Sequence, residues 1–148
     1  MRLEVLHGPN LNLLGTREPE IYGSGTLGEV DEGIRSVAAE LGVDVDILQS
    51  NHEGVLVDRI QETSGSADGY VVNAGGYTHT SVALRDALVA SGRPFVEVHL
   101  SNVHGRERFR RRSLLASAAL GTVGGFGAAS YTLALRGLVR HLEDSNEE

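Results

Sequence analysis

Short apolar segments alternate with longer amphipathic ones along this chain. Five segments rich in Val, Ile and Leu have the length and composition of buried strands, at residues 3–7, 43–48, 70–73, 95–100 and 120–123. Between them, apolar side chains recur at steps of three and four residues, which places them on one face of an α-helix. Strands that alternate with helices predict a parallel sheet with helices on both faces, and hence an α/β fold.

Capping signals locate two of the helices. Thr26 and Glu29 have the spacing of a capping box, and Gly42 follows the last apolar residue of the same amphipathic stretch, where it can end a helix. Ser50 and Glu53 form a second capping box, which predicts a helix directly after the second strand. Both predicted helices connect consecutive strands, as a parallel sheet requires.

The C-terminal half of the chain predicts two further helices. One spans residues 81–90, and the last carries an apolar face made by Tyr131, Ala134, Leu135, Leu138 and Leu142. The final residues, 143–148, are mostly acidic, and we expect them to form a frayed tail. No repeat or linker interrupts the 148 residues, so a single domain over 1–148 is expected.

Composition narrows the class of protein. The chain has no cysteine, which removes disulfides and thiolate metal sites, and it has no apolar run of the roughly 20 residues that a membrane-spanning helix needs. Its start lacks the charged, apolar and small-residue order of a signal peptide, so we expect a cytoplasmic protein without a membrane partner. A net charge of −7 disfavours nucleic-acid binding. Residues 106–112 nevertheless hold five of the thirteen basic residues, as an anion site, a subunit contact or a solvated face would.

Chemistry is expected where the strands end, because ligands of open α/β sheets bind beyond the carboxyl ends of the strands. Glu97, His99 and Ser101 alternate with apolar residues at the end of the fourth strand, so the three side chains share one face. A buried polar group without a partner costs roughly 1–3 kcal/mol, which predicts that these groups pair. Glu97 can then hold His99 in the tautomer and charge state needed to give a proton, although a purely structural pair fits the pattern as well.

Two further strand ends carry polar residues. A long loop follows the first strand and contains Arg17 and Tyr22, as a lid, a binding loop or an ordinary surface loop would. Asn73 ends the third strand, and His79 lies just before a predicted helix whose N-terminal N–H groups favour anions. Both residues fit turn and capping roles as well as ligand contacts.

Two sharper interpretations have less support. His99 and His104, with Glu97 or His79, offer nitrogen and oxygen ligands for zinc, but their spacing matches no established zinc motif, so we expect no metal. Residues 124–130 resemble part of a dinucleotide-binding fingerprint, but they follow the fifth strand rather than the first. Glycines that permit close helix–sheet packing explain them better.

Several motifs occur in order along nearly the whole chain. They are residues 7–15 (HGPNLNLLG), 17–19 (REP), 22–23 (YG), 49–54 (QSNHEG), 73–75 (NAG), 77–86 (YTHTSVALRD), 97–102 (EVHLSN) and 106 with 109–110 (R and FR). Together they resemble the type II 3-dehydroquinate dehydratases. The resemblance implies a flavodoxin-like three-layer sandwich with a five-stranded parallel sheet. It also implies anti elimination of water from 3-dehydroquinate to 3-dehydroshikimate through an enolate, a shikimate-pathway step without metal or cofactor.

The resemblance implies catalytic roles for five residues. Tyr22 is similar to the base that removes the C2 proton, and Arg17 to its partner, which also stabilises developing negative charge. Asn10 is similar to the residue that binds the water supporting the enolate. His99, oriented by Glu97, is similar to the acid that protonates the departing C1 hydroxyl. A free tyrosine has a pKa near 10, and an adjacent guanidinium favours the phenolate, so the pairing of Arg17 with Tyr22 is chemically sound.

The remaining implied residues bind substrate or a second subunit. Those expected to hold the carboxylate and the ring hydroxyls are Asn73, His79, Leu100, Ser101 and Arg110. Asp86 is similar to a residue that reaches the site of a neighbouring subunit, in a homododecamer built as a tetramer of trimers. Residues 111–118 depart from the family pattern, at positions with no catalytic assignment.

Two other functions stay open. One is a catalytically inactive module that binds a shikimate-pathway acid, against which the joint presence of Arg17, Tyr22 and His99 argues, because binding alone needs no pair of proton-transfer groups. The other is a nucleotide-binding flavodoxin-like protein, which only the glycines of residues 124–127 suggest.

Overall fold

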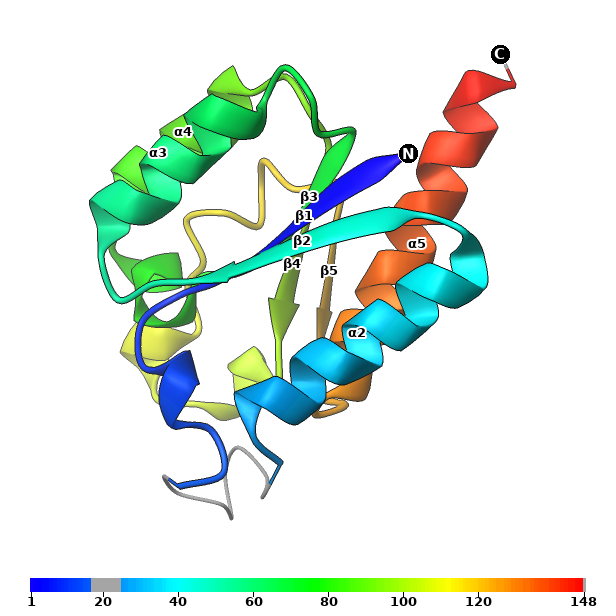
Figure 1. The fold of residues 1–148 in the computed structure, drawn as a ribbon. Coiled ribbons are helices and arrows are strands. Elements are labelled where there is room, and N and C mark those ends of the chain that lie inside the picture. Colours follow the sequence, from blue (N-terminus) through cyan, green and yellow to red (C-terminus); the bar gives the residue numbers. More distant parts are fainter. Residues whose placement is uncertain (17–24, 148) are drawn as a thin grey trace.

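A single sheet lies between two layers of helices in the computed structural model, which describes residues 1–16 and 25–147 (Figure 1). Helices α2 (Leu27–Leu41) and α5 (Ala129–Asn146) pack together on one face of the sheet. Helices α3 (Glu53–Thr63) and α4 (Val82–Ala90) pack together on the other. This arrangement confirms the α/β, flavodoxin-like three-layer sandwich expected from the sequence.

Five parallel strands form the sheet in the order β2-β1-β3-β4-β5. Their bounds are Arg2–His7 for β1, Asp44–Gln49 for β2, Gly69–Asn73 for β3, Phe95–His99 for β4 and Gly121–Gly124 for β5. Each strand end lies within one residue of its predicted position, because short apolar segments between polar turns define strands well. The chain order reverses between β1 and β3, and such a switch point opens a crevice at the carboxyl ends of the strands.

Helix α2 has the ends that the sequence predicts. The Thr26 hydroxyl accepts a hydrogen bond from the Glu29 N–H at 3.2 Å, and Gly42 ends the helix with a left-handed backbone at φ 69°. The N-cap of α4 is Ser81, whose hydroxyl accepts from the Leu84 N–H at 2.9 Å.

The predicted capping box before α3 is wrong. The Ser50 hydroxyl accepts from the N–H of His52 at 3.0 Å, only two residues ahead, and so closes a turn rather than capping a helix. His52 takes the N-cap position and Glu53 begins α3. The structure also differs from the expected tail at 143–148, because α5 continues to Asn146. An i,i+4 pair supports this last turn, with Arg140 Nε 3.2 Å from Asp144 Oδ1.

Each face of the sheet has its own apolar core. Leu3, Val5 and Val71 pack against α2 and α5, whereas Leu6 and Val72 pack against α3 and α4. Alternate residues of each strand therefore face opposite helix layers, as the pleat requires. Among the residues that the structure describes, none of the helices is long and apolar enough to cross a membrane.

The buried part of β1 contains a charged side chain. Glu4 of β1 is fully buried, and its two carboxylate oxygens accept hydrogen bonds from Arg59 Nε at 3.0 Å and Nη2 at 3.2 Å. Burial raises the pKa of Glu4 above its ordinary value, and the guanidinium of Arg59 offsets this only in part.

Candidate active site at the carboxyl ends of the strands

A cavity of about 140 Å³ lies at the carboxyl ends of β1, β3 and β4, beside the switch point of the sheet. Its walls come from loops that are far apart in the sequence. They are formed by Pro9, Asn10, Leu11, Leu13, Leu14, Asn73, Gly75, Gly76, His79, His99, Leu100, Arg106 and Arg110. The polar walls are cationic or neutral, so the cavity favours an anionic ligand with hydroxyl groups.

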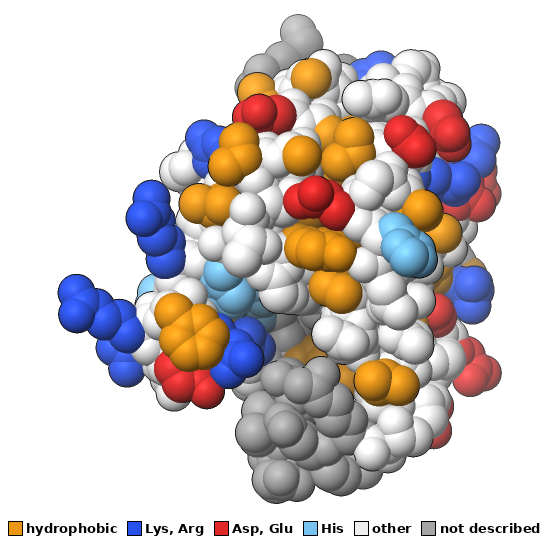
Figure 2. All heavy atoms as spheres, turned by 90° about the vertical axis from the view of Figure 1, so that its left-hand side faces the viewer, with side chains coloured by type: hydrophobic (Ala, Val, Ile, Leu, Met, Phe, Trp, Pro, Cys, Tyr) orange, Lys and Arg blue, Asp and Glu red, His pale blue; other side chains and the backbone are white. Residues whose placement is uncertain are grey.

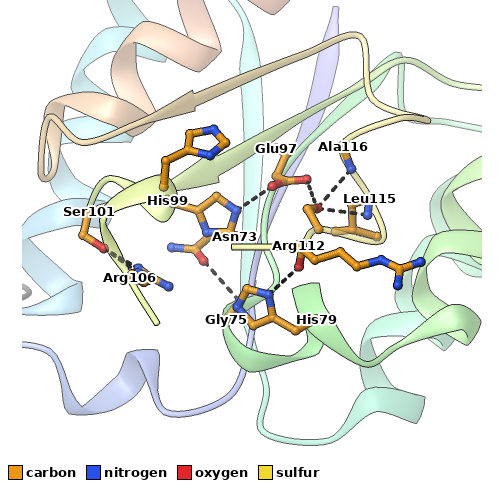
Figure 3. A network of polar contacts seen from close by, with 12 residues as sticks. Asn73, Gly75, His79, Glu97, His99, Ser101, Arg106, Arg112, Leu115 and Ala116 are labelled. Carbon is orange, nitrogen blue, oxygen red and sulfur yellow. Dashed lines mark hydrogen bonds and ion pairs between the residues drawn. The ribbon is translucent and has the colours of Figure 1, made fainter. Parts of the chain in front are cut away.

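His99 and Glu97 form the pair that the sequence predicts. Nε2 of His99 lies 2.6 Å from Oε2 of Glu97, and both side chains are buried. The other oxygen of Glu97, Oε1, accepts a hydrogen bond from the Ser113 hydroxyl at 2.6 Å. Figure 3 shows Glu97 between His99 and the segment that contains Leu115 and Ala116. With Nε2 engaged, Nδ1 of His99 has no hydrogen-bond partner within the described part of the chain and can serve a ligand.

Ser113 is itself held in place by the backbone. Its hydroxyl oxygen accepts the N–H groups of Leu115 and Ala116, both at 3.0 Å, and its own hydrogen is thereby directed to Glu97. The carboxylate therefore has a defined partner on each oxygen, which fixes the plane in which it meets His99.

The cavity wall also carries groups that can bind the hydroxyl and anionic oxygens of a ligand. Nδ1 of His79 donates to the backbone oxygen of Arg112 at 2.7 Å, which leaves Nε2 as an acceptor in the neutral ring. The guanidinium of Arg106 contacts the Ser101 hydroxyl, with Nε at 2.9 Å. Figure 2 shows the face that lies at the left of Figure 1. Several basic side chains project at one edge of this face, and histidine side chains lie beside them.

Arg110 is exposed at the rim of the cavity. Nη1 of Arg110 lies 2.9 Å from Glu107 Oε1, and the guanidinium carbon lies 4.7 Å from the centre of the Phe109 ring. A backbone hydrogen bond, and then Arg110, lower the pKa of Glu107 below its ordinary value. Pairs this exposed are weak, so Arg110 can exchange its partner for a ligand at little cost.

The loop after β1 approaches the loop after β3 so closely that only glycine fits. A Cβ at Gly8 would lie 2.2 Å from the Ala74 oxygen, and Gly75 has a φ of +58°. Asn10 also has a left-handed backbone, with φ 68°, and its N–H donates to Asn51 Oδ1 at 3.0 Å. These constraints place Asn10 and Asn73 on the same cavity.

The carboxamide of Asn73 is a buried polar group of the cavity wall. Asn73 Oδ1 accepts the Gly75 N–H at 3.1 Å, and Nδ2 donates to the Tyr131 hydroxyl at 2.9 Å. That hydroxyl lies 2.8 Å from Nδ1 of His7, whose Nε2 lies 2.7 Å from Asp31 Oδ1. A buried network thus runs from helix α2 to the cavity.

The structure brings together most of the residues predicted for the site. Those that line the cavity are Asn10, Asn73, His79, His99, Leu100 and Arg110. Glu97 and Ser101 lie directly behind this wall, bonded to His99 and Arg106. Asp86 is exposed on α4 and does not line the cavity of its own chain. Arg17 and Tyr22 lie outside the described residues.

Four polar residues of the site were not predicted. His7, Asp31, Tyr131 and Ser113 are far apart in sequence, and Tyr131 was assigned only to the apolar face of its helix. For the first three, the signal was His7 itself, because a histidine at the end of a buried strand needs hydrogen-bond partners.

The two interpretations with less support can be compared with the geometry. Within residues 1–16 and 25–147, no group of three or more Asp, Glu, His or Cys side chains is arranged to hold a metal ion. The glycines of residues 124–127 do not pack a helix against the sheet, contrary to the expectation from the sequence. A Cβ at Gly124 would lie 3.2 Å from the Ser101 oxygen, and the Gly127 N–H donates to the Leu100 oxygen at 2.9 Å, so this stretch supports the end of β4.

Fold and site define a flavodoxin-like enzyme whose cavity combines a His–carboxylate pair with groups for an anion. Residues 1–139 match the family model described as dehydroquinase class II, and the chain belongs to this family. It is 56% identical over 145 residues to the 3-dehydroquinate dehydratase of Parasynechococcus marenigrum, which covers 98% of this chain and 99% of that protein. It is also similar to the crystal structure of the type II dehydroquinase from Butyrivibrio crossotus. The TM-score is 0.91 at 41% identity, covering 93% of this chain and 97% of the other.

Proposed function

We propose that this chain dehydrates 3-dehydroquinate to 3-dehydroshikimate by anti elimination through an enolate, as a cytoplasmic enzyme of the shikimate pathway. The observation that carries the proposal is the buried Glu97–His99 pair at the wall of a cavity with cationic and hydroxyl-binding groups. The related proteins are named for this reaction, and the chain matches one of them over almost its full length.

His99 is proposed as the general acid. Glu97 holds Nε2 and complements the charge of the protonated ring, so Nδ1 is left to deliver a proton to the departing C1 hydroxyl. Leu100 and Ser101 follow directly, and their backbone groups, together with the Ser101 hydroxyl, are proposed to bind the substrate carboxylate. Asn73, His79 and Arg110 are proposed to hold the remaining carboxylate and hydroxyl oxygens.

Tyr22 is proposed as the base that removes the C2 proton, with Arg17 as its partner. Both assignments rest on the family, because these residues lie outside the described part of the chain. Asn10 is proposed to hold the water that supports the enolate, and its place at the cavity wall supports this role.

The test is turnover of 3-dehydroquinate by the purified protein, followed as the rise of enone absorbance. We expect Tyr22→Phe and His99→Ala each to lower kcat by about 10²–10⁴-fold, the usual contribution of a positioned acid or base. The matched control is His104→Ala, which removes an exposed histidine near the site and should keep wild-type turnover. A wild-type protein that binds 3-dehydroquinate without product would instead support an inactive binding module. A wild-type rate in either variant would remove that residue from the mechanism.

We further propose that the chain assembles into trimers and these into a dodecamer, with Asp86 reaching a neighbouring site. The exposed position of Asp86, outside the cavity of its own chain, supports this. Light scattering should give a mass of twelve chains of 15.8 kDa each. A monomer that is fully active would contradict the assembly and the role of Asp86 together.

A further inference from the structure

The buried network behind Asn73 joins four elements of the fold. Asp31 comes from α2, His7 from the end of β1, Tyr131 from α5 and Asn73 from the end of β3. His7 and Tyr131 are completely buried and Asn73 is 3% exposed, whereas Asp31 is partly accessible to solvent. The His7 and Tyr131 rings meet edge to face, with centroids 5.1 Å apart. The ring nitrogens of His7 and the hydroxyl of Tyr131, which solvent does not reach, must therefore find their hydrogen-bond partners within this network.

The hydrogen positions follow from the Asn73 end. The Gly75 N–H can only donate, so the atom that it meets at 3.1 Å is the carbonyl oxygen of Asn73 (Figure 3). The amide nitrogen then faces Tyr131 and donates to it. Because the Tyr131 oxygen accepts there, its single hydrogen goes to Nδ1 of His7. Burial raises the pKa of Tyr131 well above its ordinary value, so the hydroxyl keeps this hydrogen.

The same assignment follows from the other end. The Asp31 carboxylate is an acceptor, so Nε2 of His7 carries a hydrogen and donates to it at 2.7 Å. Nδ1 of the neutral ring is then the acceptor that the Tyr131 hydroxyl requires. The two ends agree, and only one arrangement of hydrogens satisfies every member. Nδ2 of Asn73 keeps one further hydrogen, which has no acceptor within residues 1–16 and 25–147, and Asn73 lines the cavity.

We propose that Asp31, His7 and Tyr131 are positioning residues that fix the Asn73 carboxamide so that it presents an N–H donor, and never its carbonyl, to a substrate oxygen. A free carboxamide can turn by half a rotation and offer either end. The network of Asp31, His7 and Tyr131 prevents this rotation, so the cavity selects a hydroxyl or carboxylate oxygen next to Asn73. The inference deepens the proposed dehydratase function and rests on it for the identity of the substrate.

The first experiment compares Tyr131→Phe with Tyr70→Phe. Tyr70 is the matched control, because it is also fully buried and its hydroxyl also lies in a hydrogen-bonded pair, 2.8 Å from Thr63 Oγ1 and among the residues facing α3 and α4. We expect Tyr131→Phe to raise KM for 3-dehydroquinate about tenfold, the loss of one well-oriented hydrogen bond, while kcat changes less. Tyr70→Phe should leave both constants unchanged.

A double-mutant cycle separates positioning from a general effect on the fold. In an Asn73→Ala background, Tyr131→Phe should cause no further rise in KM, because the group that it positions is gone. Asp31→Asn keeps an acceptor for His7 and should retain nearly wild-type kcat and KM, whereas Asp31→Leu should raise KM as Tyr131→Phe does. Additive effects of Tyr131→Phe and Asn73→Ala, or equal effects of the two Tyr→Phe variants, would overturn the proposal.

The hydrogens themselves can be measured without any activity. In protein labelled with 15N-histidine, the His7 signals should show Nε2 protonated and Nδ1 unprotonated at neutral pH. A protonated Nδ1 would overturn the proposed hydrogen arrangement of the network even in an active enzyme. If the wild-type protein does not convert 3-dehydroquinate, the proposed function fails. The spectrum still decides whether His7 accepts the hydrogen of Tyr131 as the network requires.

Discussion

At the residue scale, the catalytic assignment depends on how firmly Glu97 is held. Among the residues that the structure describes, each of its oxygens has one partner, with the Ser113 hydroxyl at 2.6 Å from Oε1 and His99 Nε2 at 2.6 Å from Oε2. Neither contact alone fixes the carboxylate plane, whereas the two together do. Ser113 thereby acts on His99 without approaching the cavity itself.

Ser113→Ala tests this dependence. Loss of the hydroxyl leaves Oε1 of Glu97 without its donor, and the carboxylate can then turn away from His99. We expect kcat to fall up to about tenfold, in line with the loss of one hydrogen bond to a charged group. Ser113→Thr, which keeps the hydroxyl, should retain most of the rate. The control is Ser117→Ala, which removes an exposed hydroxyl bonded to Arg85. If Ser113→Ala is as active as that control, Glu97 does not need Ser113.

At the scale of elements, the site is created by the contact between the loops after β1 and β3. The Gly8 N–H donates to the backbone oxygen of Asn73 at 2.7 Å, and the close approach of the two loops leaves no space for a side chain at Gly8. Asn10 belongs to the loop after β1, and Asn73 lies where the loop after β3 begins. The contact between the two loops therefore brings both polar side chains to one cavity.

Gly8→Ala should separate these loops. The added methyl group would lie 2.2 Å from the backbone oxygen of Ala74, which cannot move aside as a side chain can, so we expect a loss of about 2 kcal/mol or more in the free energy of unfolding. Turnover should fall as well. The matched control is Gly33→Ala in α2, where a Cβ meets nothing within 4 Å. There, the better helix propensity of alanine should add about 0.5–1 kcal/mol. Denaturant unfolding measures both, and equal stability of the two variants would contradict the steric argument.

How much could be predicted from the sequence differs between these features. The strands and α2 follow from local patterns, because apolar spacing, Thr26 and Gly42 act within a few residues of one another. The Glu97–His99 pair was also predictable, since a strand places alternate residues on one face. Ser50 misled the prediction, because its hydroxyl fits a turn as well as a cap. The network of His7, Tyr131 and Asp31 could not be predicted, because its members meet only when four elements pack.

At the scale of the whole molecule, Glu4 couples stability to pH. Burial raises its pKa above the ordinary value of 4.5 despite the two hydrogen bonds from Arg59. A carboxyl group whose pKa is raised by folding contributes stability below its unfolded pKa, and this contribution is lost as the pH rises through the folded pKa. The buried ionised carboxylate therefore reduces stability at neutral pH relative to the protonated form.

Glu4→Gln should remove this dependence, because glutamine stays neutral. The stability of the variant relative to wild type should increase as the pH rises from about 4 and then become constant. Urea unfolding at a series of pH values measures the difference. The exposed Glu32→Gln serves as the control, with a difference expected to be flat. A difference for Glu4→Gln that falls with rising pH would show that the attraction of Arg59 outweighs burial.

The proposed assembly makes a prediction that only a multi-chain site can satisfy. If Asp86 completes the site of a neighbour, a subunit with Asp86→Ala and a subunit with Tyr22→Phe can rescue each other in a mixed oligomer. The working site takes Tyr22 from the Asp86→Ala subunit and Asp86 from the Tyr22→Phe subunit. With equal and random mixing, one half times one half gives about a quarter of the sites intact.

Co-expressed subunits with different tags, purified through both, would show this recovery as dehydration of 3-dehydroquinate above either homo-oligomer. The control pairs Tyr22→Phe with His99→Ala. Both of these residues are assigned to the site of a single chain, so that mixture should stay inactive. If the Asp86→Ala mixture also stays inactive, although mixed oligomers form and Asp86→Ala alone is impaired, Asp86 acts within its own subunit. Its exposed place on α4, outside its own cavity, makes rescue the expected result.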